Sequence, residues 1–191
     1  MGRLFGLTAL LLFALGSNYW SANGHELLEE SLFALGILIA VLGFLGRLWC
    51  LGYISGRKKR VLVVTEPYSL CRHPLYFCSF LGALGLGLCT ETLTAPLLIA
   101  LAFAIYYPSV IRTEERFLSA NFPHYAVYRR RVPAFFPRWS AFVDERDLQL
   151  DPRAFRRELL AAGSAIPIIA GVELIEAFHR VAWLPSVFLI P

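Results

Sequence analysis

Long apolar stretches are the feature that most constrains the fold of this chain. A helix crosses the hydrocarbon core of a membrane with about 20 mostly apolar residues, at about 1.5 Å of rise per residue. Stretches that approach this length run over Leu4–Trp20, Ser31–Ile54, Leu75–Cys89, Leu93–Ile111 and Ile166–Ile190. The pattern predicts an all-α integral membrane helix bundle with about five transmembrane helices.

The composition agrees with a membrane protein. Of the 191 residues, 57% are hydrophobic and 17% are charged, whereas soluble domains have about 45–50% and about 25%. So small a soluble core could not bury this much apolar surface. We expect one membrane domain over 1–191, with two spans in 1–54, a functional core in 55–139, an amphipathic helix in 140–163 and a hydrophobic helix in 164–191. A nucleic-acid partner is not expected.

Cysteine usage predicts no metal site. The four cysteines show neither C-x-x-C spacing nor a pairing with histidine that would indicate zinc. They are Cys50, Cys71, Cys78 and Cys89. We expect them to be reduced and structural.

The first and last apolar stretches leave alternatives open. Leu4–Leu15 after Arg3 has the length of a signal peptide, but no small-x-small cleavage site directly follows, and we favour a retained span. The last stretch carries a stripe of ionisable residues that would face the bundle interior in a fifth helix. The stripe consists of Glu173, Glu176, His179 and Arg180. The alternative is an arm that dips into the membrane interface and returns.

Positive charges predict the orientation. Residues 55–73 hold five Lys and Arg and residues 112–163 hold ten, so fifteen of the eighteen lie in two loops. The links at Ser17–Glu30 and Thr90–Thr92 hold none. Because cytoplasmic loops are enriched in Lys and Arg, we expect a multi-pass protein with both basic loops in the cytoplasm. In the second loop, Asp151-Pro152 and Gly163 delimit an amphipathic helix that lies either on the membrane surface or on the protein itself.

The candidate functional side chains lie at the expected cytoplasmic ends of the third and fourth stretches. Arg72 and His73 open the third stretch, and Glu114 and Glu115 follow the fourth. The short link between these stretches makes them antiparallel neighbours, so the four side chains should meet in one cleft. Taken singly, each residue fits a structural role at a helix end. Their convergence exceeds what topology requires.

These residues form a recognisable pattern. The run Thr65–Tyr76, which contains Arg-His-Pro-x-Tyr, resembles the signature of the isoprenylcysteine carboxyl methyltransferase and phospholipid methyltransferase superfamily. The pair Glu114-Glu115 and the later run Tyr128 to Pro133 agree with it. The resemblance covers about Arg47 to Trp139.

The resemblance implies an integral membrane enzyme that uses S-adenosyl-L-methionine without a Rossmann domain, and no G-x-G-x-x-G motif is present. It implies a cytoplasmic cofactor pocket formed by the ends of the third and fourth helices and the following segment. Mapped by motif, the cofactor-binding residues are Leu62, Val63, Tyr68, Arg72, His73, Pro74, Leu75, Tyr76 and Glu114. The catalytic candidates are Arg112 and Glu115. Membrane lipids are the expected surroundings, and the expected methyl acceptor is lipid-like or a small hydrophobic molecule.

Three departures from the family pattern bear on the site. The first is the stretch Pro123-His124-Tyr125, which is one residue shorter than usual. Glu66 stands where the family usually has glycine, so the turn before Tyr68 could differ. Val110 stands where carboxyl methyltransferases carry an arginine, which puts the isoprenylcysteine substrate in doubt. The other hypotheses are an NADPH-dependent reductase of the sterol-reductase kind and a non-catalytic protein that binds lipid headgroups.

Overall fold

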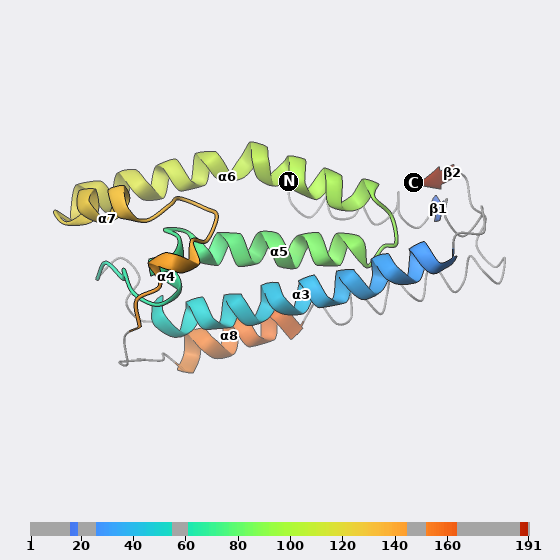
Figure 1. The fold of residues 1–191 in the computed structure, drawn as a ribbon, viewed down its shortest axis with the longest axis horizontal. Helices are drawn as coiled ribbons and strands as arrows, with labels where there is room; N and C mark the ends of the chain where they lie inside the picture. Colours follow the sequence, from blue (N-terminus) through green and yellow to red (C-terminus); the bar gives the residue numbers. More distant parts are fainter. Residues whose placement is uncertain (1–15, 19–25, 55–60, 145–151, 164–187, 191) are drawn as a thin grey trace.

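A computed structural model describes residues 16–18, 26–54, 61–144, 152–163 and 188–190 (Figure 1). The helices are α3 (Glu26–Ile54), α4 (Pro67–Leu70), α5 (Pro74–Leu88), α6 (Thr94–Asn121), α7 (Tyr125–Arg131) and α8 (Pro152–Gly163). A 3₁₀ turn covers Trp139–Ala141, and the strands are β1 (Gly16–Asn18) and β2 (Phe188–Ile190). The long helices α3, α5 and α6 lie side by side with α5 between the other two, while α4 and α7 lie at one end (Figure 1).

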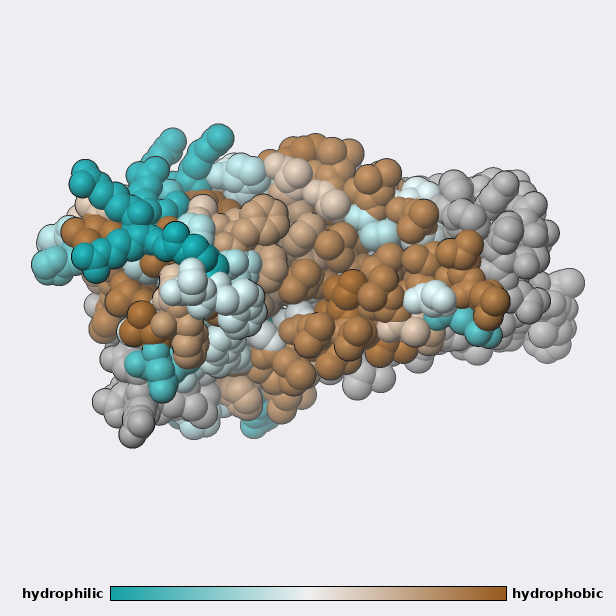
Figure 2. All heavy atoms as spheres, in the orientation of Figure 1, coloured by the Kyte–Doolittle hydropathy of each residue, from teal (hydrophilic) through white to brown (hydrophobic). Residues whose placement is uncertain are grey.

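The outer faces of the long helices are apolar. Both α3, over Leu27–Ile54, and α6 are long and apolar enough to cross a membrane. Of the residues in their apolar stretches, only 11% are buried in α3 and none are buried in α6. Leu97 and Ile105 of α6 are 70% and 73% exposed. Figure 2 shows hydrophobic residues along the middle of the molecule and hydrophilic ones at the end with α7. Exposed apolar faces of this kind require an apolar solvent, which indicates a membrane.

The helices extend the predicted spans. Helix α3 begins at Glu26 rather than Ser31, and α6 continues to Asn121 rather than ending at Ile111. The pair Glu114-Glu115 therefore lies within a helix, not after one. Helix α5 confirms the third stretch as helical, but its 15 residues rise only about 22 Å, less than the roughly 30 Å of a hydrocarbon core.

The amphipathic helix predicted after Asp151 is present as α8. It lies alongside α3 (Figure 1), with Arg153, Arg156 and Arg157 exposed. Of the two placements considered from the sequence, this contact favours docking on the protein itself.

The first and last apolar stretches lie mostly outside the described residues, as do Glu173, Glu176, His179 and Arg180. Where they are described, the prediction of helix is wrong: Gly16–Asn18 and Phe188–Ile190 form a parallel pair, with Gly16 opposite Phe188. Glycine, serine and asparagine are weak helix formers, and the end of the last stretch lies between two prolines, which disfavours helix there. The count of five helices stays a prediction.

Helices α3 and α5 approach each other through small residues. A Cβ atom added to Gly43 would lie 2.3 Å from the backbone nitrogen of Gly82, and one added to Gly85 would lie 2.3 Å from the backbone nitrogen of Ala40. Small residues that let two backbones touch are the usual means of helix association in membranes. Within the described residues, the four cysteines form no disulfide bond.

This contact gives a prediction. Gly43→Ala should lower the free energy of unfolding by about 1–3 kcal/mol, because the new methyl group meets backbone that cannot rotate away. Gly82→Ala is the matched control: nothing lies within 4 Å of its added Cβ, so it should raise stability by about 0.5–1 kcal/mol. Denaturant unfolding of the detergent-solubilised protein measures both. Equal effects of the two substitutions would contradict the close approach at Gly43.

Candidate functional site

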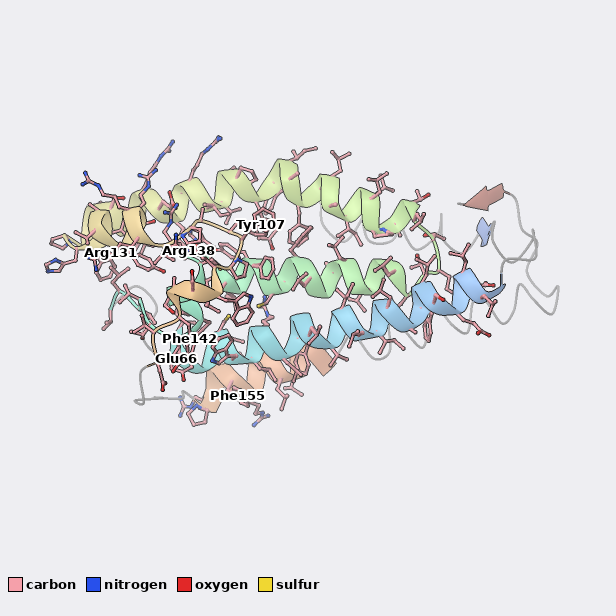
Figure 3. All side chains as sticks on the ribbon, viewed as in Figure 1. Glu66, Tyr107, Arg131, Arg138, Phe142 and Phe155 are labelled. Carbon is pink, nitrogen blue, oxygen red and sulfur yellow. The ribbon has the colours of Figure 1, made fainter. Side chains whose placement is uncertain are left out.

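A tight turn positions the motif before α4. The carbonyl oxygen of Thr65 accepts a hydrogen bond of 3.1 Å from the amide of Tyr68. Between them, Glu66 has φ 55° and ψ −126°, a conformation that favours glycine. Its amide donates to the Val143 carbonyl at 2.8 Å, beside Phe142 (Figure 3). The turn thus keeps its glycine geometry although a glutamate occupies it.

The strain at Glu66 can be measured by comparing two substitutions that both remove the carboxylate. Glu66→Gly should be more stable than Glu66→Ala by about 1–2 kcal/mol, because alanine is strained at this φ and glycine is not. This difference already allows for the greater conformational entropy that glycine has in the unfolded chain. At the exposed helical position Ser119 of α6, Ser119→Ala should instead be more stable than Ser119→Gly by about 0.5–1 kcal/mol. Denaturant unfolding provides both differences. Alanine as stable as glycine at position 66 would contradict the strain.

The segment after α7 holds the Arg-His-Pro loop in place. The amides of Arg72 and His73 donate to the carbonyls of Pro133 and Ala134 at 2.8 and 3.2 Å. The Arg72 Nη1 atom donates to the carbonyls of Arg129 at 2.7 Å and Val132 at 3.0 Å. The guanidinium of Arg72 therefore fastens the end of α7 to the start of α5.

The four side chains expected to meet do so. Arg72 Nη2 lies 2.8 Å from Glu115 Oε1, and both side chains are nearly buried, at 11% and 13% exposed. The His73 ring lies between the two glutamates, with Nδ1 3.5 Å from Glu114 Oε2 and Nε2 3.5 Å from Glu115 Oε1. The carboxylate of Glu115 also lies 3.7 Å from Nε of Arg129. This ion network joins α5, α6 and α7.

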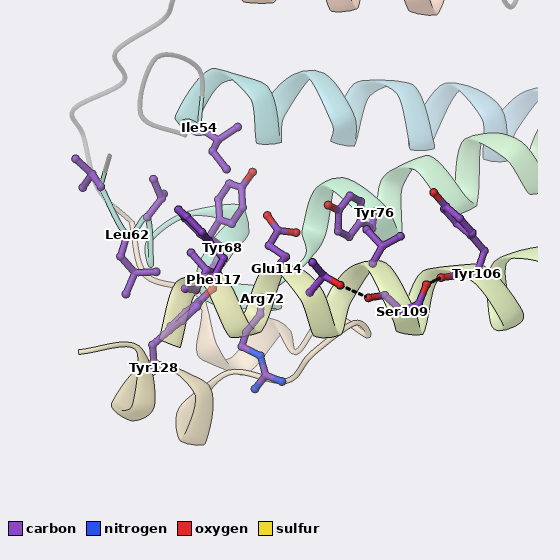
Figure 4. A pocket seen from close by; sticks show the side chains of 15 residues that line it. Ile54, Leu62, Tyr68, Arg72, Tyr76, Tyr106, Ser109, Glu114, Phe117 and Tyr128 are labelled. Carbon is purple, nitrogen blue, oxygen red and sulfur yellow. Dashed lines mark hydrogen bonds between the residues drawn. The ribbon is translucent and has the colours of Figure 1, made fainter. Parts of the chain in front are cut away.

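A cavity of about 560 Å³ opens beside this network (Figure 4). Six of the predicted cofactor-binding residues line it: Leu62, Val63, Tyr68, Arg72, Tyr76 and Glu114. The remaining predicted residues, which are His73, Pro74, Leu75, Arg112 and Glu115, are not part of its lining. Glu114 faces the cavity between Tyr68 and Tyr76 (Figure 4), whereas Glu115 faces the ion network. The roles assigned to all these residues stay predictions.

Several cavity-lining residues of α6 were not predicted from the sequence. Tyr106, Ser109, Thr113 and Phe117 line the cavity together with Val110. They share one face of α6 with Glu114, so the helical spacing from Glu114 was the signal that could have found them. Only Thr113 and Phe117 lie in the part of α6 beyond Ile111. Tyr128 of α7 also lines the cavity.

Three buried tyrosines lie at or next to the cavity: Tyr68 and Tyr128 line it, and Tyr125 packs with Tyr128. The Tyr128 hydroxyl donates to the Tyr68 carbonyl at 2.6 Å. Burial raises the pKa of Tyr68 and of Tyr128 above the usual range, and burial followed by the Glu115 carboxylate raises the pKa of Tyr125 to about 12. All three therefore stay protonated at neutral pH. The buried Tyr68 hydroxyl has no hydrogen-bond partner within the described residues, so it is available to a ligand in the cavity.

The similarity to known proteins covers the same region of the chain. The model of the phospholipid methyltransferase family matches residues 29–124, which include the whole cavity lining except Tyr128. The chain is 42% identical over 189 residues to the nickel-cobalt-cadmium resistance protein NccN of Alcaligenes xylosoxydans xylosoxydans, covering 99% of this chain and 87% of the relative. It is 48% identical over 179 residues to the cobalt-zinc-cadmium resistance protein CzcN of Cupriavidus metallidurans, covering 94% and 81%.

A shorter match reaches a named methyltransferase. The protein-S-isoprenylcysteine O-methyltransferase of Schizosaccharomyces pombe is 35% identical over 85 residues, which is 44% of this chain and 36% of the relative. No solved structure matches the chain significantly. The family match over half of the chain, joined to this relative, places the protein: it belongs to the phospholipid methyltransferase family, in the superfamily that also contains the isoprenylcysteine carboxyl methyltransferases.

Proposed function

We propose that this chain is an integral membrane methyltransferase that uses S-adenosyl-L-methionine and methylates a lipid-like or membrane-partitioning acceptor. The observation that carries the proposal is the cavity with Glu114 on its wall, at the end of the bundle where α6 leaves its apolar stretch. That end also carries the arginines of α6 and α7. We therefore place the cavity mouth in the cytoplasm, following the bias of Lys and Arg.

The residues of the cavity suit the cofactor. S-adenosyl-L-methionine supplies an electrophilic methyl group on a sulfonium and also carries an ammonium and an aromatic base. The cavity volume of about 560 Å³ lies within the range of small-molecule sites. Glu114 supplies a negative charge for a cationic group, the Tyr68 hydroxyl supplies a donor, and Tyr76 and Tyr106 supply aromatic faces.

The rest of the lining favours an apolar acceptor. Ile54, Val61, Val110 and Phe117 line the same cavity, and the neighbouring outer face of α6 is exposed and apolar. A lipid-like molecule could reach the site from the membrane while the cofactor arrives from the cytoplasm. Because Val110 replaces the arginine of carboxyl methyltransferases at this wall, we do not extend the isoprenylcysteine substrate to this chain.

Calorimetry on the detergent-solubilised protein tests the cofactor. S-adenosylhomocysteine should bind, and NADPH should not. NADPH binding alone would support the sterol-reductase alternative, and binding of neither would support a non-catalytic headgroup-binding protein. A lipid extract incubated with the protein and methyl-labelled S-adenosylmethionine would then identify the acceptor by the label it acquires.

We further propose that methyl transfer by this chain contributes to resistance to divalent metal ions. The support is that NccN and CzcN, which match nearly the whole chain, are named for such resistance. Bacteria producing the wild-type chain should tolerate more cobalt, nickel or cadmium than bacteria producing Glu114→Gln. Bacteria producing Arg116→Gln, which changes an exposed charge on the same helix, should grow like the wild type. Equal growth of all strains and of one without the gene would contradict the proposal.

A further inference from the structure

A second cavity adjoins the first and is lined by residues of α7 and by residues of 62–69 and 138–143. Its volume is about 490 Å³, and Leu62 and Tyr128 form a wall that the two cavities share. Apolar side chains such as Val127 and Val143 make up most of its surface. The proposed methyl transfer does not use this cavity.

The polar groups around the second cavity are basic. His124, Arg131 and Arg138 belong to its lining, which contains no aspartate or glutamate. Nη2 of Arg138 donates to the backbone carbonyl of Arg131 at 2.6 Å, which holds the Arg138 guanidinium at the end of α7 (Figure 3). Within the described part of the chain, neither guanidinium forms an ion pair with a carboxylate. Two arginines in the lining of one cavity, without a carboxylate counterion, suit a phosphate.

The surroundings of the second cavity resemble a membrane interface. Phe136 and Trp139 flank Arg138 and are 72% and 73% exposed. Val143, which lines the cavity, is 52% exposed. Exposed aromatic residues next to arginines are typical of the headgroup level of a membrane. The cavity therefore offers an apolar interior and a basic rim at the level where phospholipid headgroups lie.

We propose that the second cavity binds one anionic phospholipid. Arg131 and Arg138 hold the phosphate, and the apolar interior takes the first carbons of the acyl chains. A phospholipid satisfies both features, whereas a free phosphate satisfies only the rim and a neutral lipid only the interior. The inference does not rest on the proposed methyl transfer, because lipid binding alone tests it.

Native mass spectrometry of the full chain in detergent tests this site with dioleoylphosphatidylglycerol as the probe. The wild type should retain one molecule of this lipid more tightly than dioleoylphosphatidylcholine. The double variant Arg131→Gln/Arg138→Gln should bind it at least about tenfold more weakly, as expected for lost charge-assisted hydrogen bonds. The double variant Arg116→Gln/Arg130→Gln removes the same charge from exposed positions outside the lining and should bind like the wild type.

A second kind of variant keeps the charges and fills the space. Val127→Trp should block binding of the lipid while leaving both arginines in place. The site is overturned if Arg131→Gln/Arg138→Gln and Val127→Trp both bind like the wild type, or if the control double variant loses as much affinity as the first. It is also overturned if phosphatidylcholine binds equally well, or if equimolar glycerol 3-phosphate displaces the lipid.

Discussion

Glu115→Gln is expected to lower the free energy of unfolding by about 3 kcal/mol. The Glu115 carboxylate is nearly buried and lies 2.8 Å from Arg72 and 3.5 Å from His73. Breaking a buried ion pair by removing one partner typically costs about 3–5 kcal/mol, because the other charge stays buried. The low end applies here because Arg72 keeps two carbonyl acceptors. Denaturant unfolding in detergent measures the change.

Exposed Arg116 on the next position of α6 supplies the control. Arg116→Gln should change the free energy of unfolding by less than about 0.5 kcal/mol. If Glu115→Gln unfolds like the wild type, the network is not what joins α5, α6 and α7. The same variant also tests the catalytic prediction, once its methyl transfer is divided by its folded fraction. A normal turnover per folded molecule would mean that Glu115 is not a catalytic residue.

The sequence predicted the helices better than their ends. Apolar runs mark the part of a helix that lies in lipid, and the run in α6 stops at Ile111 where Arg112 begins a charged stretch. Glutamate and arginine are good helix formers, so α6 continues until Asn121, two residues before Pro123. Hydropathy therefore predicted the apolar portion of α6 and missed its charged extension over 112–121, which carries part of the cavity wall.

The residue pattern brought Glu114 and Glu115 to one cleft, but only the family resemblance, and not the pattern, gave them different roles. Adjacent residues on a helix point about 100° apart, so one faces the cavity and the other faces Arg72. The rotation of α6 about its axis decides which of the two glutamates faces the cavity and which faces Arg72. That rotation is set by packing, such as the close approach of Gly87 to Pro96 and Ile99, and no local pattern encodes it.

The turn at Glu66 shows another limit of sequence reasoning. Replacement of glycine by glutamate suggested a different turn, yet the backbone keeps the glycine conformation. Hydrogen bonds to Val143 and from Ser69 hold Glu66 on both sides of the residue. The restraint comes from residues far away in the chain as well as near, so the tertiary structure overrides the local preference.

Glu114→Gln should weaken binding of S-adenosylhomocysteine about ten- to hundredfold. Loss of a charge-assisted hydrogen bond in a partly dry site costs about 1.5–3 kcal/mol, which corresponds to that change in affinity. The Glu114 side chain lines the cavity and is 30% exposed, and its contact with His73 is a long one of 3.5 Å. The substitution should therefore leave the free energy of unfolding nearly unchanged, in contrast to Glu115→Gln.

Calorimetry at a temperature where every variant is folded separates these two glutamates. Arg116→Gln, with its altered charge on the same helix but outside the cavity lining, should bind S-adenosylhomocysteine like the wild type. Glu115→Gln should lose stability far more than affinity, because its carboxylate belongs to the ion network and not to the cavity lining. Binding by Glu114→Gln within twofold of the wild type would mean that the cofactor lies elsewhere, whatever the stability of the variants.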